Sequence, residues 1–170
     1  MLQPLPTPNV RDAVCEMLPR LRRLARALTG HVHDADDLVQ VAVERALARA
    51  PQWQPDRPVQ AWLYGILRNA WIDEQRARKR QQPFHAPEEA GEDVGVSSID
   101  HYVEQLSMAA AMARLPDEQR LAVSLVLVEG LSYAEAAAVM EVPVGTLTSR
   151  LARGRQALQA ILAEDTGASR

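Results

Sequence analysis

The chain has 170 residues, 47% of them hydrophobic, and its 19 Lys and Arg against 22 Asp and Glu give a formal net charge of −3. Its length allows one domain or two small ones, and its charge excludes a uniformly basic nucleic-acid-binding protein. The single cysteine, Cys15, excludes an internal disulfide and suits a reducing compartment, and we expect it to be a small buried residue on a helix.

The composition also excludes several structural classes. No basic-then-apolar signal pattern opens the chain, and no apolar run reaches the roughly 20 residues that span a bilayer. We therefore expect a cytoplasmic protein without membrane insertion. Ala, Leu and Arg, which are strong helix formers, abound, whereas alternating strand patterns are nearly absent. The predicted fold class is all-α.

The charges divide the chain into parts. Residues 1–82 carry 13 Lys and Arg and 9 Asp and Glu, residues 83–112 carry 6 Asp and Glu without Lys or Arg, and residues 113–170 carry 6 and 7. Basic clusters at the ends indicate nucleic-acid contact by part of the chain. Pro, Gly and acidic residues with little apolar periodicity predict a flexible acidic linker at residues 83–99, between two small helical domains at 1–82 and 100–170.

The first domain is predicted to contain three helices. Apolar residues at three- and four-residue steps predict a helix that ends at Gly30, with Pro19 kinking it or starting a new helix. These residues are Val14, Met17, Leu18, Leu21, Leu24 and Leu28. Residues 31–33 are predicted to form a turn, with Asp34 capping a second helix that runs to about Ala50. After a proline-rich loop, a third helix is predicted near 59–80 from the stripe Val59, Trp62, Leu63, Ile66, Leu67 and Ala70.

The second domain is predicted to end in a helix-turn-helix. Helical pattern runs from 100 to 114 and from 117 to Gly130, with Pro116 between them. Ser132 and Glu135 form a capping box that opens a short helix to about Met140. A turn at 141–143 then leads into a last helix, whose inward face holds Leu147, Leu151, Leu158 and Leu162.

The outer face of this last helix is a candidate DNA-recognition surface. If Leu147 and Leu151 point inward, the helical step of about 100° per residue turns four residues outward. They are Thr148, Ser149, Ala152 and Arg153, flanked by Arg150 and Arg155. Short polar side chains and Arg suit base edges and phosphates. The competing interpretation is an ordinary helical hairpin with a solvated face.

The third helix carries a second candidate surface for nucleic acid. One face holds Asn69, Asp73, Arg76 and Arg80, and the aromatic residues Trp62, Tyr64 and Trp71 lie nearby. Amide and guanidinium groups can read an exposed base, and aromatic rings can stack on unpaired bases. The competing interpretation is a core helix with aromatic packing and a solvated basic end.

A third face is a candidate docking site for a protein. Asp37, Gln40 and Glu44 lie within about 60° of each other on an ideal helix. The competing interpretation is a solvated helix surface. The residues from His31 to Asp36 fit a solvated turn better than a metal site, because no Cys or further His completes a ligand set. No catalytic constellation or phosphate loop stands out, so no enzyme and no cofactor are predicted.

Two groups of motifs resemble a known family. Residues 34–40 (DADDLVQ), 61–70 (AWLYGILRNA) and 72–74 (IDE) resemble domain two of the extracytoplasmic-function (ECF) bacterial RNA polymerase sigma factors. Residues 115–120 (LPDEQR), 129–135 (EGLSYAE) and 142–153 (VPVGTLTSRLAR) resemble domain four of the same group. The resemblance covers nearly the whole chain outside the first residues and the linker.

The resemblance implies a sigma factor that binds core RNA polymerase and directs promoter recognition in a stress response, under control of an anti-sigma factor. Asp37 and Gln40 would contact the clamp coiled coil of the largest polymerase subunit, and Asn69 would capture a flipped base of the minus-ten element. The minus-thirty-five element would meet Thr148, Ser149 and Arg153.

The sequence departs from the family pattern at four positions. At Thr148 and Ala152 many relatives carry larger or basic side chains. Gly65 and Gly154 replace better helix formers, at a cost of about 1 kcal/mol each if exposed.

Two other functions remain open on the sequence alone. A sigma mimic that sequesters an anti-sigma factor would not need Asn69, Arg76, Arg80 or Arg153. A stand-alone helix-turn-helix regulator with a ligand-binding helical domain would leave the segment from Asp37 to Gln40 unexplained.

Overall fold

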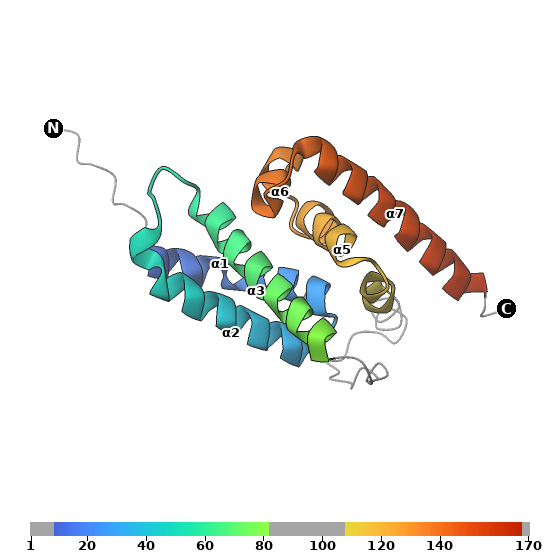
Figure 1. Cartoon of the computed structure of the whole chain (residues 1–170), viewed down its shortest axis with the longest axis horizontal. Helices are drawn as coiled ribbons and strands as arrows, with labels where there is room; N and C mark the ends of the chain where they lie inside the picture. Colours follow the sequence, from blue (N-terminus) through green and yellow to red (C-terminus); the bar gives the residue numbers. More distant parts are fainter. Residues whose placement is uncertain (1–8, 82–107, 168–170) are drawn as a thin grey trace.

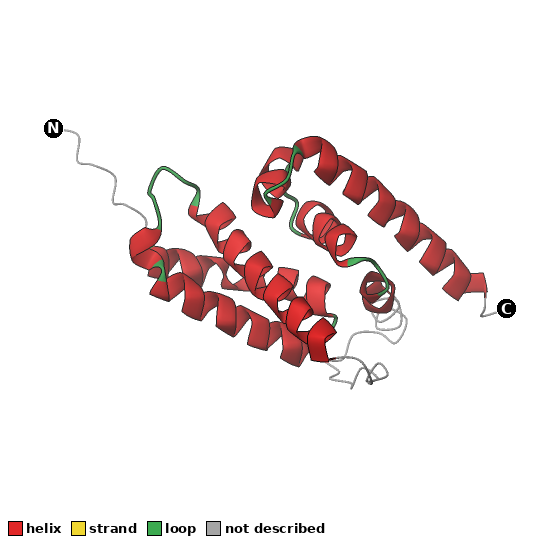
Figure 2. Ribbon diagram, in the orientation of Figure 1, coloured by secondary structure: helices red, strands yellow, loops and turns green. Residues whose placement is uncertain are grey.

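The computed structural model describes residues 9–81 and 108–167, and within these ranges the ordered elements are all helices (Figures 1 and 2). The predicted all-α class is confirmed. The predicted linker at 83–99 and the start of the second domain lie outside the described residues. Among the described helices, none combines the length and apolar character needed to cross a membrane.

The first domain is a bundle of three helices, α1 (Val10–Thr29), α2 (Val32–Ala48) and α3 (Val59–Gln81), with a short 3-10 turn, η1 (Ala50–Gln52), after α2. Each helix packs against the other two. The predicted apolar face of α1 forms the core, because Val14, Met17, Leu21, Leu24 and Leu28 are all buried, with Leu18 partly buried beside them. Gly30 ends α1 as predicted, in the left-handed conformation at φ 76°.

Two local predictions in this domain, on Cys15 and on the start of α2, are wrong, and a third is wrong in one of its two alternatives. Helix α1 continues through Pro19, so no new helix starts there. Pro19 cannot donate to the carbonyl of Cys15, but Cys15 is exposed rather than buried, so that carbonyl lies on the solvent side of α1. Helix α2 begins at Val32, with His31 as a cap that makes no side-chain bond. Asp34 lies inside the first turn, where it forms an ion pair with Arg78 of α3 at 3.1 Å.

The second domain contains helical residues 108–113, then α5 (Asp117–Val123), a π-helical turn η2 (Ser124–Val128), α6 (Tyr133–Met140) and α7 (Val144–Gly167). The predicted capping box is present: Glu135 N donates to Ser132 Oγ at 3.2 Å, and Ser132 N donates to Glu135 Oε2 at 2.8 Å. These bonds lower the pKa of the Glu135 carboxyl. The inward face of α7 is confirmed, since Leu147, Leu151 and Leu158 are buried.

Gly154 lies where α7 packs on α5, and it is buried rather than exposed. A Cβ atom at this position would lie 2.7 Å from Val123 Cγ2 and 3.3 Å from the Gln119 carbonyl oxygen. The expected cost of a glycine in a helix is therefore not the only effect at this position. The close packing of α5 and α7 requires a residue without a side chain. At Gly65 no atom lies within 4 Å of the added Cβ.

This contrast gives a stability prediction. Gly154→Ala should destabilise the protein, because overpacking costs about 1–3 kcal/mol, more than the roughly 1 kcal/mol that Ala gains over Gly in a helix. Gly65→Ala is the matched control. It should stabilise the protein by the roughly 1 kcal/mol that Ala gains over Gly in a helix. Urea unfolding followed by circular dichroism measures both. A Gly154→Ala protein more stable than wild type would show that α5 and α7 pack less closely than described.

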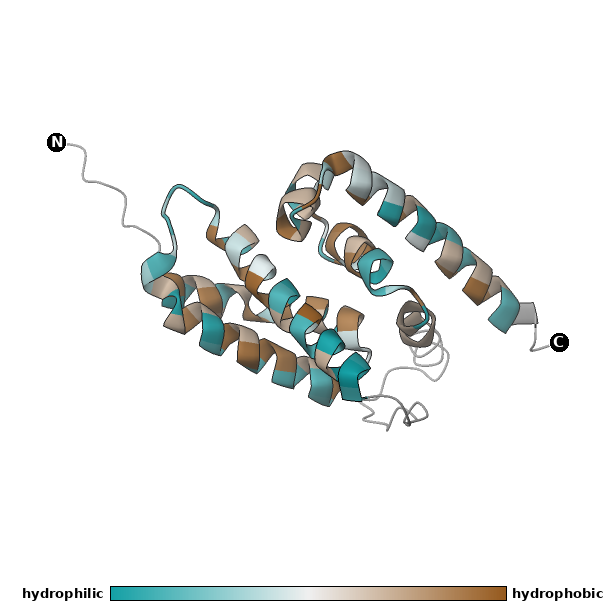
Figure 3. Ribbon diagram, viewed as in Figure 1, coloured by the Kyte–Doolittle hydropathy of each residue, from teal (hydrophilic) through white to brown (hydrophobic). Residues whose placement is uncertain are grey.

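The two domains pack against each other through α1 with η2 and through α3 with α6. In Figure 1, α5 and α6 face the green α3, and α7 lies on their far side. The C-terminal end of α3, teal in Figure 3, is strongly hydrophilic, in agreement with its exposed Arg76, Lys79 and Arg80.

Candidate polymerase and nucleic-acid interfaces

The acidic face of α2 is exposed as a unit. Asp37, Gln40 and Glu44 all lie on the solvent side of the helix, while Leu38, Val39 and Ala42 turn into the core. Gln40 Nε2 donates to Glu44 Oε1 at 3.2 Å, which links two of the three side chains. Helix α2 therefore presents carboxylates and an amide to solvent, while its other side packs on α1 and α3 of the first domain.

A pocket of about 410 Å³ lies between α3 and the second domain. Trp62, Asn69, Arg49 and Arg57 line it from the first domain, and α6 closes its other side with Ala138, Val139 and Glu141. Its volume is within the range of small-ligand pockets. Trp62 is half-buried and Asn69 is exposed, so an aromatic face, an amide and two guanidinium groups meet in one cavity.

Arg68, which the sequence did not single out, binds the side chain of Asn69, one of the residues that line this pocket. Its side chain is only 6% exposed. Its Nε and Nη2 both donate to Asn69 Oδ1, at 3.0 and 2.6 Å. The amide oxygen of Asn69 is therefore already occupied. The available signal was its position about one helical turn from both Tyr64 and Trp71, which are buried, because a buried guanidinium requires several acceptors.

Two of the three aromatic residues on α3 belong to the fold. Tyr64 and Trp71 are each 1% exposed, so neither ring can stack on a base in this structure. Burial raises the pKa of Tyr64, whose hydroxyl donates to Glu129 Oε2 at 2.7 Å. Trp71 lies under the Arg120 guanidinium at 6.0 Å. For these two residues aromatic packing is the correct interpretation, and only Trp62 faces a pocket.

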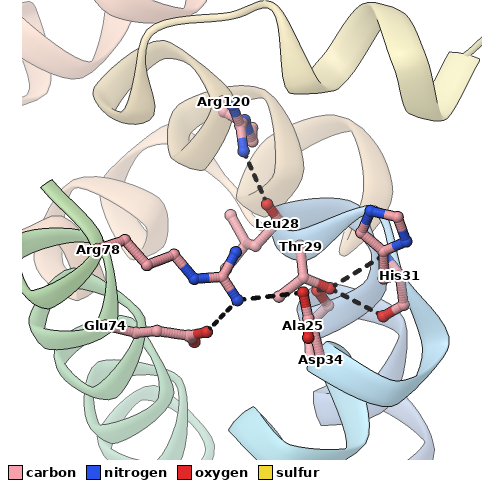
Figure 4. Close-up of polar contacts among 8 residues, drawn as sticks. All are labelled: Ala25, Leu28, Thr29, His31, Asp34, Glu74, Arg78 and Arg120. Carbon is pink, nitrogen blue, oxygen red and sulfur yellow. Dashed lines mark hydrogen bonds and ion pairs between the residues drawn. The ribbon is translucent and has the colours of Figure 1, made fainter. Parts of the chain in front are cut away.

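The basic end of α3 is only partly free for a ligand. Asp73 forms an ion pair with Arg45 of α2 at 2.8 Å. Arg78 binds both Asp34 and Glu74 (Figure 4). Arg76 and Arg80 are exposed and line a shallow pocket together with Asp73 and Lys79. Arg76 and Arg80 are therefore directed outward at this end, while the exposed Lys79 forms an ion pair with Asp117 of the second domain at 2.7 Å.

The first turns of α7 present the predicted recognition face. Thr148, Ser149 and Arg153 are exposed, as predicted from the helical step. The two hydroxyl groups donate to carbonyls one turn back, Thr148 to Val144 at 2.8 Å and Ser149 to Gly145 at 3.1 Å, which leaves their lone pairs available as acceptors. Arg150 differs, because it is half-buried and forms an ion pair with Glu118 at 2.8 Å.

A helical bundle with an amide-and-arginine pocket, joined to a helix-turn-helix, defines a two-domain DNA-binding protein. Comparison with known proteins gives the family. Residues 14–81 match the model of Sigma-70 region 2, and residues 105–158 match the model of Sigma-70, region 4. The chain belongs to the ECF group of RNA polymerase sigma factors, and it is therefore an initiation factor that binds core RNA polymerase and directs it to promoter DNA.

Three similar proteins match this chain over nearly its whole length. The ECF RNA polymerase sigma factor EcfG of Rhodopseudomonas palustris (strain TIE-1) is 38% identical over 165 residues, which cover 95% of this chain and 91% of the relative. The sigma factor RpoE from Bartonella quintana, solved in complex with the anti-sigma factor NepR, superposes with a TM-score of 0.73 at 28% identity, over 90% of this chain and 96% of that one. CnrH, solved in complex with the cytosolic domain of CnrY, superposes with a TM-score of 0.70 at 27% identity, over 92% and 88%. The match to region 2 excludes a stand-alone helix-turn-helix regulator.

Proposed function

We propose that three surfaces of the protein make three different contacts during transcription initiation. The face formed by Asp37, Gln40 and Glu44 docks on core polymerase. The pocket at Asn69 captures a base of the minus-ten element, and Thr148, Ser149 and Arg153 hold the minus-thirty-five element. The observation that carries this assignment is the exposed Asn69 amide at the rim of a pocket that also contains the ring of Trp62.

The chemistry of this pocket suits an extruded base. The face of Trp62 supplies a stacking surface, and stacking of a base on an aromatic ring is worth about 1–3 kcal/mol. Asn69 supplies the hydrogen bonds that read a base edge. Arg49 and Arg57, which the sequence did not single out, supply positive charge for the phosphates beside it.

Other charged residues lie outside this pocket. Arg76 and Arg80 extend the positive charge along α3. Arg150 supports the upstream contact through its pair with Glu118. Asp73, held by Arg45, would shape the surface rather than contact phosphate.

The protein as a whole is proposed to act without catalysis of its own, in the cytoplasm, where the polymerase is. Domains at 1–82 and 100–170, joined by a linker at 83–99, would carry the downstream and upstream contacts. Control by an anti-sigma factor is supported by RpoE from Bartonella quintana, which was solved bound to the anti-sigma factor NepR. We further propose that this control serves a stress response, as the family resemblance implies. No cofactor is required for any of these contacts.

The upstream contact has a direct test in Arg153→Ala. Arg153 projects from α7 on the same side as Ser149. If it reads a base, the variant should lose roughly 1–3 kcal/mol of affinity for the upstream element and accept other bases at that position. If it contacts a phosphate, all sequences should weaken about equally and the salt dependence should flatten. Electrophoretic mobility shift of the holoenzyme at several salt concentrations separates the two. The matched control is Arg114→Ala, an exposed arginine of the second domain that pairs with Glu164 and lies outside the recognition face.

The proposed function as a whole is tested by run-off transcription. Core polymerase, genomic promoter fragments and this protein should yield discrete transcripts that are absent without the protein. Binding to core polymerase without any promoter-specific transcript would favour a sigma mimic over an initiation factor.

A further inference from the structure

Arg68 and Asn69 are consecutive residues of α3 with different surroundings. The Arg68 side chain is only 6% exposed, whereas Asn69 is exposed and lines the pocket of about 410 Å³. Arg68 nevertheless reaches its neighbour, because its Nε and Nη2 donate to Asn69 Oδ1 at 3.0 and 2.6 Å. A carbonyl oxygen has two lone pairs, and these two bonds use both of them.

This contact also fixes which end of the Asn69 amide is free. A guanidinium has only donors, so the amide must turn its oxygen toward Arg68 and its nitrogen away from it. Nδ2 donates to no residue that the structure describes, so its two N–H groups remain for a ligand. Asn69 therefore offers donors and no acceptor.

The other side chains of the pocket have the same polarity. Among the described residues that line it, only Asn69 and Glu141 carry a side-chain oxygen, and both bind Arg68. The other polar side chains of the lining are all donors, namely Arg49, Arg57 and Trp62. A ligand of this pocket must therefore supply acceptors.

The contact between Arg68 and Asn69 does not depend on the second domain. Arg68 also donates to the Val139 carbonyl at 2.6 Å and to Glu141 at 2.8 Å, both of which belong to that domain. The bonds to Asn69 instead join neighbours on one helix, and they require neither of these acceptors. Arg68 therefore orients the amide from within the first domain.

The orientation of the amide determines which base the pocket can read. A free amide donates and accepts at once, and it pairs in this way with adenine, which presents an amino donor beside a ring-nitrogen acceptor. With its oxygen occupied, Asn69 cannot accept from that amino group, and its own N–H groups face the amino group donor to donor. Thymine, guanine and cytosine each carry a carbonyl oxygen that can accept from Nδ2, and adenine has none. Stacking on Trp62 does not compensate, since every base has a π face.

We propose that Arg68 is a positioning residue that fixes Asn69 as a hydrogen-bond donor, so that the captured base is one with a carbonyl oxygen and adenine is rejected. This inference rests on the proposed role of Asn69 in base capture. It assigns base selection in part to a residue that does not itself line the pocket.

The test measures the affinity of the holoenzyme for single-stranded DNA by fluorescence anisotropy. The probes are labelled oligonucleotides with the non-template minus-ten sequence of a promoter that the protein transcribes, with each of the four bases in turn at each position. The captured position is the one at which Asn69→Ala loses discrimination among the bases. There the wild-type holoenzyme should bind the thymine probe at least about fivefold more tightly than the adenine probe, which corresponds to one net hydrogen bond.

Reversing the polarity of Asn69 should reverse this preference. Asn69→Asp has the same shape and keeps Arg68 as its partner, but it presents an acceptor in place of Nδ2. Adenine can donate its amino group to the carboxylate, so the adenine probe should then bind at least about fivefold more tightly than the thymine probe. Gln60→Glu is the matched control: it makes the same change at an exposed position at the start of α3, outside the pocket, and should keep the wild-type preference.

The role of Arg68 itself is tested by Arg68→Met, which removes every donor. This variant should raise the affinity for adenine relative to thymine by about fivefold or more, because the amide oxygen is then free to accept. A purely structural defect would weaken both probes alike and leave their ratio unchanged. Arg68→Lys supplies at most one of the two bonds and should change the ratio in the same direction to a smaller extent. Circular dichroism checks folding, and Arg22→Met at an exposed position of α1 is the control.

The outcomes separate this inference from the proposed function. A wild-type preference for adenine at the position that depends on Asn69, or an unchanged ratio in natively folded Arg68→Met, would overturn the role of Arg68 while base capture by Asn69 stands. If neither Arg68 variant keeps a native spectrum, the wild-type and Asn69→Asp ratios decide, and failure of the reversal overturns the inference. Discrimination that Asn69→Ala leaves unchanged at every position would overturn base capture itself, and this inference with it.

Discussion

Replacement of both Asp37 and Gln40 by Arg is expected to weaken binding to core polymerase by roughly 100-fold or more, since like charges brought together at an interface cost several kcal/mol. Both side chains are exposed, so the fold should be unaffected. Arg at position 40 would also keep a partner on α2, because Glu44 lies one turn away and an i,i+4 ion pair replaces the present amide–carboxylate bond. The loss should therefore fall on docking alone.

Fluorescence anisotropy of the labelled protein titrated with core polymerase measures this loss, with circular dichroism as the check on folding. Glu16→Arg is the control: it reverses an exposed acidic side chain on α1, outside the docking face. If the double variant binds core polymerase as tightly as wild type and keeps a native spectrum, the acidic face of α2 is a solvated surface and the polymerase contacts another part of the first domain.

Structural elements that depend on residues close together in the chain could be predicted from the sequence. The capping box of α6 closes within three residues, from Ser132 to Glu135, and the outward face of α7 follows from the spacing of Leu147 and Leu151. The stop at Gly30 follows from its freedom to adopt φ 76°. Pro19 does not start a new helix, because the apolar face of α1 on both sides of it packs into one core and this packing outweighs the loss of one backbone bond.

Contacts between distant parts of the chain could not be predicted. The partners of Glu129 lie 65, 106 and 109 residues away, and Arg68 reaches acceptors 71 and 73 residues away. Nothing in the local pattern pairs these residues, because even where the pattern indicates a buried Arg or Glu, it does not identify the distant residue that binds it. The same limit applies to Tyr64 and Trp71, whose periodicity placed them near the candidate face while contacts with the second domain bury them.

Replacement of Asn69 by Ala is expected to impair promoter opening while leaving polymerase binding unchanged. Asn69 is exposed on α3 beside the half-buried Trp62, and its amide oxygen is held by Arg68 in the free protein. The amide can donate to one base edge, and when Arg68 does not occupy its oxygen it can also accept from that edge, a contact worth about 1–3 kcal/mol. Extruding a base costs a few kcal/mol, and the pocket must recover that cost.

The expected defect depends on the template. On duplex promoter DNA, Asn69→Ala should lower run-off transcription by about 5- to 150-fold, the equivalent of 1–3 kcal/mol. On a template with a mismatched start region the defect should shrink, because the DNA then supplies the unpairing itself. Gln60→Ala removes another exposed amide from the start of α3, outside the pocket, and should leave both templates unaffected. An equal loss on both templates would mean that Asn69 acts in base recognition or folding without a part in opening. Full activity on both would mean that α3 does not capture a base, because the only amide in this pocket, among the residues that the structure describes, would then be dispensable.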